Sequence, residues 1–290
     1  MKLANNWKDY EIIDCSNGEK LERWKDVYLL RPDPQIIWDN GNLLDRYKDL
    51  VNARYIRSDK GGGHWDNLKK TKASWKVSYD NLLFNIKQMG FKHTGLFPEQ
   101  AYNWEFFIDK IKRTNRDIKV LNLFAYTGGA TVACISAGAH VTHVDSSKGM
   151  VDWSKENVKD SLLDETKVRY IVDDVVKFVQ REIRRGNKYD AIIMDPPSYG
   201  RGSNGEVWDI EKDLFYLVKI CLEVLTDNPL FFQINSYTTG LSKEVLSNIL
   251  KITVGERFEG VVTSEELGLP ISNSELVLPC GIYGRYENNE

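Results

Sequence analysis

A polar residue follows each of four successive apolar runs in the middle of the chain; the four residues are Thr127, Asp145, Asp174 and Asp195. Apolar runs of this length form strands that are buried on both faces of a parallel sheet. The carboxyl ends of parallel strands meet at one edge, which is where open α/β sheets bind ligands. Three acids in register at that edge therefore indicate a binding site rather than a chance scatter of surface charge.

Each acid suits a different part of a nucleoside-containing cofactor. Asp145 ends the second run, where its carboxylate can accept both hydroxyls of a ribose. Asp173 or Asp174 can accept the amino group of adenine, and the sequence leaves open which of them does so. Asp195 is followed by two prolines that stiffen its loop, so it is expected to face the reacting group and a second substrate.

The segment Lys119–Thr131 reads as strand, glycine turn and helix, with Thr127, Gly128 and Gly129 at the turn. Such a turn exposes backbone N–H groups to an anionic or polar ligand group. The glycine spacing does not fit the G-x-G-x-x-G pattern that lets a pyrophosphate approach the backbone. The turn instead suits S-adenosylmethionine, which ends in an amino acid.

From residue 119 onward, the chain alternates apolar runs with helical patterns. Strands are expected over 119–124, 140–144, 167–172, 189–194 and 230–235, with helices after them and a β hairpin over 258–286. A glycine-rich loop is expected over 200–205, with a helix beginning at about Trp208. This order predicts a doubly wound α/β sheet of seven strands, with its last strand antiparallel.

Residues 1–79 are predicted to form a small β-rich domain, and residues 80–290 the catalytic domain. Five of the eight tryptophans fall in the first part, where a β core or base-stacking platforms would use them. A basic cluster around Trp65 and Trp75 is either a phosphate-contacting surface or a solvated loop; it consists of Arg57, Lys60, Lys69, Lys70, Lys72 and Lys76.

Composition narrows the class of protein. The 290 residues are 42% hydrophobic and contain no apolar run long enough to span a membrane. The first residues lack the apolar core of a secretion signal, and the four cysteines are scattered singly, so a cytoplasmic protein without a metal site is expected. Residues 1–118 hold 21 Lys and Arg against 17 Asp and Glu, and the remainder 18 against 25. The N-terminal part is therefore the more plausible surface for a polyanion.

Three stretches together resemble the class I S-adenosylmethionine-dependent methyltransferases, in the branch of 23S ribosomal RNA base methyltransferases. They are 92–100 (KHTGLFPEQ), 120–129 (VLNLFAYTGG) and 195–199 (DPPSY). The resemblance covers about residues 80–285 and implies a methyltransferase with an RNA substrate. In that branch the loop 92–100 folds over the cofactor. The implied cofactor-binding residues are Thr94, Phe97, Gln100, Phe124, Ala125, Tyr126, Thr127, Gly128, Asp145, Ser146, Asp173, Asp174 and Asp195. The implied catalytic residues are Asp195, Pro196, Pro197 and Tyr199.

The atom that is methylated depends on the residues near the fifth strand. Relatives that methylate carbon 5 of cytosine use a cysteine after that strand, and this chain has none in 233–238. Enzymes for exocyclic amines have an aromatic residue directly after the two prolines, where this chain has Ser198. A ring nitrogen such as guanine N7 needs only alignment, and it is favoured here. Tyr199 either stacks on the base or packs beneath the glycine loop.

Three other readings stay open. A small-molecule or protein acceptor is compatible with the net charge of −3. An NAD-dependent oxidoreductase or a silent nucleotide-binding module belongs to a different class. The missing G-x-G-x-x-G argues against the oxidoreductase, and the Asp195 loop argues against a silent module.

Overall fold

The computed structural model describes residues 1–58, 61–202 and 205–290. The chain folds into two compact units. The α/β unit consists of Met1, 102–267 and 281–290, and the β unit consists of 2–101 and 268–280. The sequence prediction divided the chain at residue 80, whereas the units assign 80–101 and 268–280 to the N-terminal part. The division of labour between RNA contact and catalysis stays a prediction.

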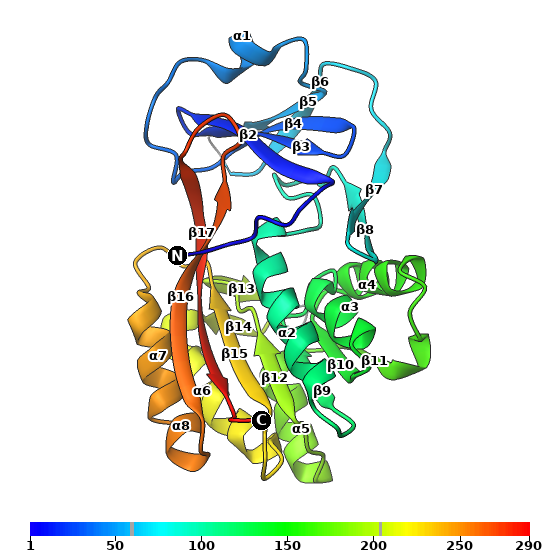
Figure 1. Cartoon of the computed structure of the whole chain (residues 1–290), viewed down its shortest axis with the longest axis vertical. Helices are drawn as coiled ribbons and strands as arrows, with labels where there is room; N and C mark the ends of the chain where they lie inside the picture. Colours follow the sequence, from blue (N-terminus) through cyan, green and yellow to red (C-terminus); the bar gives the residue numbers. More distant parts are fainter. Residues whose placement is uncertain (59–60, 203–204) are drawn as a thin grey trace. The chain divides into compact units, whose positions relative to one another are not determined.

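The α/β unit is organised around a mixed sheet in the order β16-β17-β15-β12-β9-β10-β11 (Figure 1). The strands are β9 (Lys119–Leu123), β10 (His140–Asp145), β11 (Val168–Val172), β12 (Ala191–Met194), β15 (Phe231–Ser236), β16 (Val261–Pro270) and β17 (Val277–Glu287). The pairs from β11 to β15 are parallel, and β17 runs antiparallel to β15. The predicted doubly wound sheet with an antiparallel last strand is confirmed.

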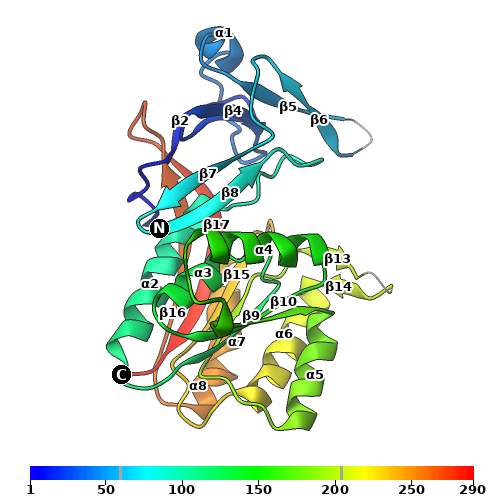
Figure 2. The same cartoon turned by 90° about the vertical axis from the view of Figure 1, so that its right-hand side faces the viewer.

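Helices cover both faces of this sheet (Figure 2). They are α2 (Ala101–Arg113), α3 (Gly129–Ser136), α4 (Lys148–Asp160), α5 (Val175–Arg185), α6 (Ile210–Cys221), α7 (Lys243–Lys251) and α8 (Val254–Arg257), with 3₁₀ turns η2 (Glu165–Lys167) and η3 (Leu222–Val224). Phe231 stacks on Phe107 of α2, with 5.2 Å between ring centroids, whereas Phe232 joins the core formed with α5 to α8. Since successive side chains of a strand point to opposite faces, these two phenylalanines anchor the two helical layers.

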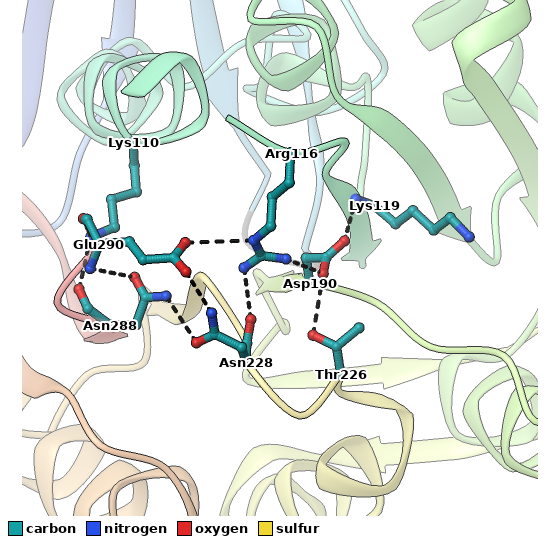
Figure 3. A network of polar contacts seen from close by, with 8 residues as sticks. All are labelled: Lys110, Arg116, Lys119, Asp190, Thr226, Asn228, Asn288 and Glu290. Atoms are coloured by element: carbon teal, nitrogen blue, oxygen red, sulfur yellow. Dashed lines mark hydrogen bonds and ion pairs between the residues drawn. The ribbon is translucent and has the colours of Figure 1, made fainter. Parts of the chain in front are cut away.

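A polar network fixes the amino ends of the central strands (Figure 3). The carboxylate of Asp190 accepts hydrogen bonds from the Lys119 N–H at 2.8 Å, from Arg116 Nη1 at 2.6 Å and from Thr226 Oγ1 at 3.2 Å. Arg116 also donates to the carbonyl of Asn228 and pairs with Glu290. These bonds hold the starts of β9 and β12 together.

The β unit contains a five-stranded sheet in the order β2-β3-β4-β5-β6 and a separate two-stranded sheet of β7 and β8. Its elements are β2 (Tyr10–Ser16), β3 (Glu19–Trp24), β4 (Val27–Pro32), α1 (Leu43–Tyr47), β5 (Ala53–Arg57), β6 (Gly63–Asn67), β7 (Ser74–Tyr79), β8 (Leu82–Lys87) and η1 (Pro98–Gln100). Leu21, Leu30, Leu43 and Val51 form a small core. The predicted β-rich N-terminal region is confirmed.

Glu22, Arg31 and Tyr10 form a buried hydrogen-bonded cluster inside the β unit. The carboxylate of Glu22 is fully buried and accepts hydrogen bonds from Nε and Nη2 of Arg31 and from the hydroxyl of Tyr10. A buried ion pair needs such additional donors to offset the cost of removing two charges from water. The Arg31 guanidinium accordingly holds the pKa of Glu22 at about 2.

The prediction for residues 200–209 is wrong in part. Instead of a glycine loop followed by a helix from Trp208, the chain forms a two-stranded ribbon, β13 (Tyr199–Arg201) with β14 (Val207–Asp209). Asp209 caps the next helix through the Glu211 N–H, so α6 begins at Ile210. Positions 203–204 of the predicted loop, and Lys60 of the basic cluster, lie outside the described residues.

Among the helices of the described residues, none combines the length and apolar character that a bilayer crossing requires.

Candidate functional site

The turn after β9 has an unusual backbone. Phe124 and Tyr126 have φ angles of 53° and 52°, and Gly128 follows with a φ angle of 82°. A Cβ on Gly128 would lie 2.0 Å from Oγ of Ser154, so only glycine fits that position. A Cβ on Gly129 would lie 2.7 Å from Cζ2 of Trp104. The two glycines therefore bring the start of α3 into close contact with both α4 and α2.

Asp145, at the end of β10, holds this turn. Its Oδ2 accepts a hydrogen bond from the Tyr126 N–H at 2.9 Å, and its Oδ1 accepts one from the Ser147 N–H at 2.8 Å. Burial raises the pKa of the Asp145 carboxyl above its ordinary value, although the two backbone donors oppose that shift. A carboxylate oxygen has about two acceptor sites, so each oxygen keeps capacity for a ligand hydroxyl. The adjacent Ser146 is exposed.

Asp173 and Asp174 have different surroundings after β11. The Asp174 side chain accepts from the Lys177 N–H at 2.9 Å and caps α5. The Asp173 side chain forms an ion pair with Arg181 and accepts from the Asp174 N–H. The Asp173 N–H also donates to the carbonyl of Asp145 at 3.1 Å, which joins the ends of β10 and β11.

The loop after β12 is fixed at several points. The Asp195 N–H donates to the carbonyl of Leu123 at 3.3 Å, so this loop starts beside the β9 turn. Indole Nε1 of Trp208 donates to the carbonyl of Pro197 at 2.7 Å. The hydroxyls of Ser198 and Thr238 lie 2.7 Å apart and connect the loop to the segment after β15.

Within this loop, Pro196 is buried, while Pro197 and Tyr199 are exposed. The Tyr199 side chain lies at the start of β13 with 56% of its surface accessible. The reading in which Tyr199 packs beneath a glycine loop therefore has no support, since the ring is open to solvent.

A buried polar layer lies beneath the β9 turn, and the sequence reading missed it. Thr131 Oγ1 accepts from Asn122 Nδ2 at 3.0 Å and lies 2.9 Å from Nδ1 of His143. Burial lowers the pKa of His143 to about 3, so its ring is neutral at physiological pH. Asn157 Nδ2 donates to the carbonyl of Thr127 at 2.9 Å and fixes the turn from α4. An asparagine inside an apolar strand run was the available signal, because a buried amide needs hydrogen-bond partners.

The loop 92–100 belongs to the β unit. Thr94 and Gln100 are buried there, and Phe97 is half-buried with its ring 5.4 Å from that of His93. The backbone of this segment is held at two carbonyls, with Trp7 Nε1 donating to Pro98 at 2.9 Å and Arg31 Nη1 donating to Lys92 at 2.9 Å. The cofactor contacts implied for Thr94, Phe97 and Gln100 stay a prediction.

The remaining predicted residues lie in the α/β unit at the carboxyl ends of four neighbouring strands. Hydrogen bonds link the β9 turn to Asp145, Asp145 to Asp173, and Asp195 to the end of β9. The arrangement presents acceptors at the ends of β10 and β11 beside a turn that fixes backbone groups. Carboxylates at these positions can accept hydrogen bonds from ligand hydroxyl and amino groups.

Comparisons with known proteins agree with this arrangement. The family model of S-adenosylmethionine-dependent methyltransferases matches residues 43–240. The crystal structure of a SAM-dependent methyltransferase from Agrobacterium tumefaciens superposes with a TM-score of 0.91 at 34% identity, covering 99% of this chain and 93% of that one.

Curated relatives share shorter regions. Ribosomal RNA large subunit methyltransferase K/L of Colwellia psychrerythraea is 26% identical over 74% of this chain and 30% of its own length. Ribosomal RNA large subunit methyltransferase I of an Enterobacter species is 40% identical over 51% of this chain and 39% of its own length. The chain thus spans well under half of the length of these two relatives.

Proposed function

The chain belongs to the family of S-adenosylmethionine-dependent methyltransferases, and from this premise we propose that it methylates a nucleobase of ribosomal RNA. The observation that carries the cofactor part of this proposal is the position of Asp145. Its half-buried carboxylate is oriented by two backbone donors and keeps acceptor capacity for ribose hydroxyls. S-adenosylmethionine, when bound, supplies an electrophilic methyl group.

Further cofactor contacts follow from the same edge. The backbone from Phe124 to Gly128 lies beside Asp145, where it is placed to meet the amino acid end of the cofactor. Asp173 or Asp174 is proposed to accept the adenine amino group: Asp174 caps α5 through Oδ1, and Asp173 accepts from the Asp174 N–H and pairs with Arg181. The ion pair with Arg181 leaves 22% of the Asp173 side chain exposed.

The loop 195–199 is proposed to bind the base. Its two prolines and the bond from Trp208 limit its motion, which favours alignment of an acceptor with the methyl group. For a guanine acceptor, the N7 lone pair forms the new bond to the methyl carbon, and the carbon–sulfur bond breaks with its electron pair going to sulfur. No proton leaves N7, so the chain needs no general base for this reaction.

The cysteines support a ring nitrogen over carbon 5 of cytosine. Carbon-5 methylation needs a cysteine thiolate that attacks carbon 6 of the base. Cys134 and Cys221 are fully buried, and burial raises the pKa of both thiols. Strand β15 ends on Ser236, and Tyr237 and Thr238 follow it, so no cysteine stands at this place.

Ribosomal RNA is proposed because the curated relatives carry that substrate in their names. The direct test incubates the protein with tritiated S-adenosylmethionine and protein-free large-subunit RNA from cells that lack the gene, and identifies the methylated nucleoside by mass spectrometry. We expect 7-methylguanosine. Formation of 5-methylcytidine would reject the ring-nitrogen assignment and keep the RNA substrate.

Label that enters only protein or small molecules from a cell extract would instead establish the alternative acceptors. Calorimetry with S-adenosylhomocysteine, and with NAD as the comparison, checks the cofactor independently of any acceptor. Binding of NAD with no binding of S-adenosylhomocysteine would reject the whole proposal.

A further inference from the structure

A pocket of about 450 Å³ lies within the β unit, away from the loop 92–100 in sequence. Three segments form it: the turn between β3 and β4, the residue before β5, and the stretch leading into β7. Its lining residues are Lys25, Asp26, Val27, Asn52, Lys70, Thr71, Lys72, Ser74, Trp75 and Lys76. Four of these ten side chains are lysines and one is an aspartate, so the pocket is strongly basic.

Three lysines of this pocket have no carboxylate partner among the described residues. Lys25, Lys70 and Lys72 are exposed, and none of them pairs with a carboxylate among residues 1–58, 61–202 and 205–290. Seven lysines elsewhere do pair with acids: Lys20, Lys110, Lys148, Lys155, Lys177, Lys212 and Lys243. What sets the pocket apart is that unpaired lysines from two distant segments line one hollow. The charges of Lys25, Lys70 and Lys72 are therefore available to an external anion.

Asn52 gives the pocket a defined frame. Its Oδ1 accepts from the Tyr28 N–H at 2.7 Å, and its own N–H donates to the Tyr28 carbonyl at 2.9 Å. Its carbonyl accepts from the N–H groups of Leu68 and Lys69 at 2.9 and 3.0 Å. Asn52 thus joins the start of β4 to the segment that carries Lys70 and Lys72. The backbone that bears these two lysines is therefore held in place by hydrogen bonds.

Lys25 is placed by the β3–β4 hairpin. Trp24 pairs with Val27 across a two-residue turn, and Lys25 has a φ angle of 60°. Tight hairpins need positive φ values at this position. The turn thereby fixes the backbone of Lys25, which lines the pocket together with residues of the distant basic stretch 70–76.

The aromatic residues of the region favour phosphate over base recognition. Trp75 is 91% buried, so its ring cannot serve as an open platform for a base. Its indole N–H has no acceptor within the described part of the chain. Trp65 donates to the Met89 carbonyl and packs edge-on against Tyr55. What the pocket offers a ligand is cationic donors, which suit phosphate oxygens.

We propose that this pocket binds phosphate groups of the RNA backbone and so docks the substrate on the β unit. The inference rests on the proposed function, because it takes RNA to be the acceptor. Ammonium groups that meet phosphates release counterions, which gives affinity without reading sequence. The base would then be selected elsewhere, by the loop 195–199.

The test compares two triple variants of the full chain. Lys25→Ala/Lys70→Ala/Lys72→Ala removes the unpaired charges of the pocket, and Lys2→Ala/Lys8→Ala/Lys48→Ala removes three charges of the same unit outside it. Binding of a fluorescein-labelled 20-nucleotide single-stranded RNA is measured by anisotropy over a range of salt concentrations. We expect the pocket variant to lose about tenfold or more in affinity at 0.1 M salt, and its plot of log affinity against log salt to become shallower by about 2.

The control variant is expected to stay within about threefold of the wild-type affinity. Both variants should bind S-adenosylhomocysteine as the wild type does, which shows that the fold is retained. Equal losses of RNA affinity in the two variants would overturn the pocket and leave the proposed function standing. A wild-type protein that neither binds nor methylates RNA would overturn the proposed function as well. Competition by poly-L-glutamate as strong as that by RNA would assign the pocket to acidic protein partners and also reject the proposal.

Discussion

The Asp145 carboxylate and the Tyr126 N–H are joined by a hydrogen bond of 2.9 Å between Oδ2 and N. Tyr126 has a φ angle of 52°, which points its N–H toward the end of the neighbouring strand β10. A non-glycine residue with positive φ costs free energy. The hydrogen bond to the half-buried carboxylate offsets that cost, so Asp145, the proposed ribose acceptor, and the glycine turn form one structural unit.

Asp145→Ala is expected to weaken S-adenosylhomocysteine binding by about 2–4 kcal/mol, because a carboxylate that accepts two hydroxyls is lost. Calorimetry measures the change. Asp152→Ala is the matched control, since Asp152 pairs with Lys148 and Lys155 on the surface of α4. A change below about threefold for Asp145→Ala would reject the ribose assignment. Asp145→Asn keeps one oxygen acceptor for the turn and separates lost binding from a disturbed fold.

The same calorimetry can follow pH. Burial raises the pKa of Asp145, and the ribose contact requires the ionised form. Cofactor affinity should therefore begin to fall on acidification at a higher pH than an ordinary aspartate would give. In Asp145→Asn this fall in cofactor affinity at low pH should be absent. A fall that persists in the variant would assign it to another group.

Gly128→Ala is expected to destabilise the protein by more than Gly138→Ala. Both glycines have positive φ, at 82° and 101°, so both variants incur backbone strain of about 1–2 kcal/mol. Only at Gly128 would the new methyl group meet Ser154, which adds about 1–3 kcal/mol. Chemical denaturation measures the two values. Combining Gly128→Ala with Ser154→Gly should recover part of the loss, and equal costs for the two glycines would contradict the packing argument.

Tyr199→Ala is expected to reduce methyl transfer to RNA through loss of a stacking contact of about 1–3 kcal/mol. Its exposed ring at the start of β13 is available for a flat base. Affinity for S-adenosylhomocysteine should stay within about twofold, and Tyr199→Phe should be nearly silent because only the ring face is used. If alanine lowers both cofactor affinity and melting temperature while phenylalanine restores both, Tyr199 is structural.

Serine variants of Cys134, Cys221 and Cys280 are expected to retain methyl transfer, apart from effects on stability. Burial raises the pKa of each of these thiols, which disfavours the nucleophilic thiolate. The measurement is covalent trapping on RNA that contains 5-fluorocytosine. A trapped adduct that disappears in one serine variant would restore the carbon-5 mechanism.

Glu22→Gln is expected to destabilise the protein by about 3–5 kcal/mol, because it replaces the buried carboxylate that accepts from Nε and Nη2 of Arg31 with a neutral amide. Glu19→Gln is the control, since the Glu19–Arg54 pair is partly exposed and should contribute about 0–1 kcal/mol. The folded pKa of Glu22 is about 2, below its usual value of 4.5. Its contribution is therefore complete above pH 4.5 and lost as pH falls toward 2. Denaturation at several pH values should show this loss in the wild type and not in Glu22→Gln.

Much of the α/β unit follows from the sequence. The runs 119–123 and 231–236 are buried as strands, and Asp145 ends its strand as predicted. These elements are readable because a strand covered on both faces is rich in apolar residues along its length, although Asn122, Gln233 and Asn235 interrupt these two runs. A chain whose apolar runs alternate with helices then has few topologies open to it.

The glycine pattern gave a wrong prediction for residues 199–209, where contacts with distant residues decide the structure. Glycines at 200, 202 and 205 indicate a loop, yet the flanking residues pair as β13 and β14. Three-residue strands carry too little periodicity to be recognised. The anchor that orders this ribbon is Trp208, whose indole bonds to Pro197 eleven residues earlier.

The sequence alone determined which segments form the strands of the α/β sheet, where the glycine turn lies and which acids follow the strands. These features depend on residues that are neighbours along the chain. Only the tertiary structure decided that Asn122, Thr131 and His143 share one buried hydrogen-bond layer. It also decided that Lys25 faces the same pocket as Lys70 and Lys72. The physical reason is that hydrogen bonding and burial depend on distances between atoms. Residues that are far apart in the chain come within those distances only when the whole unit folds.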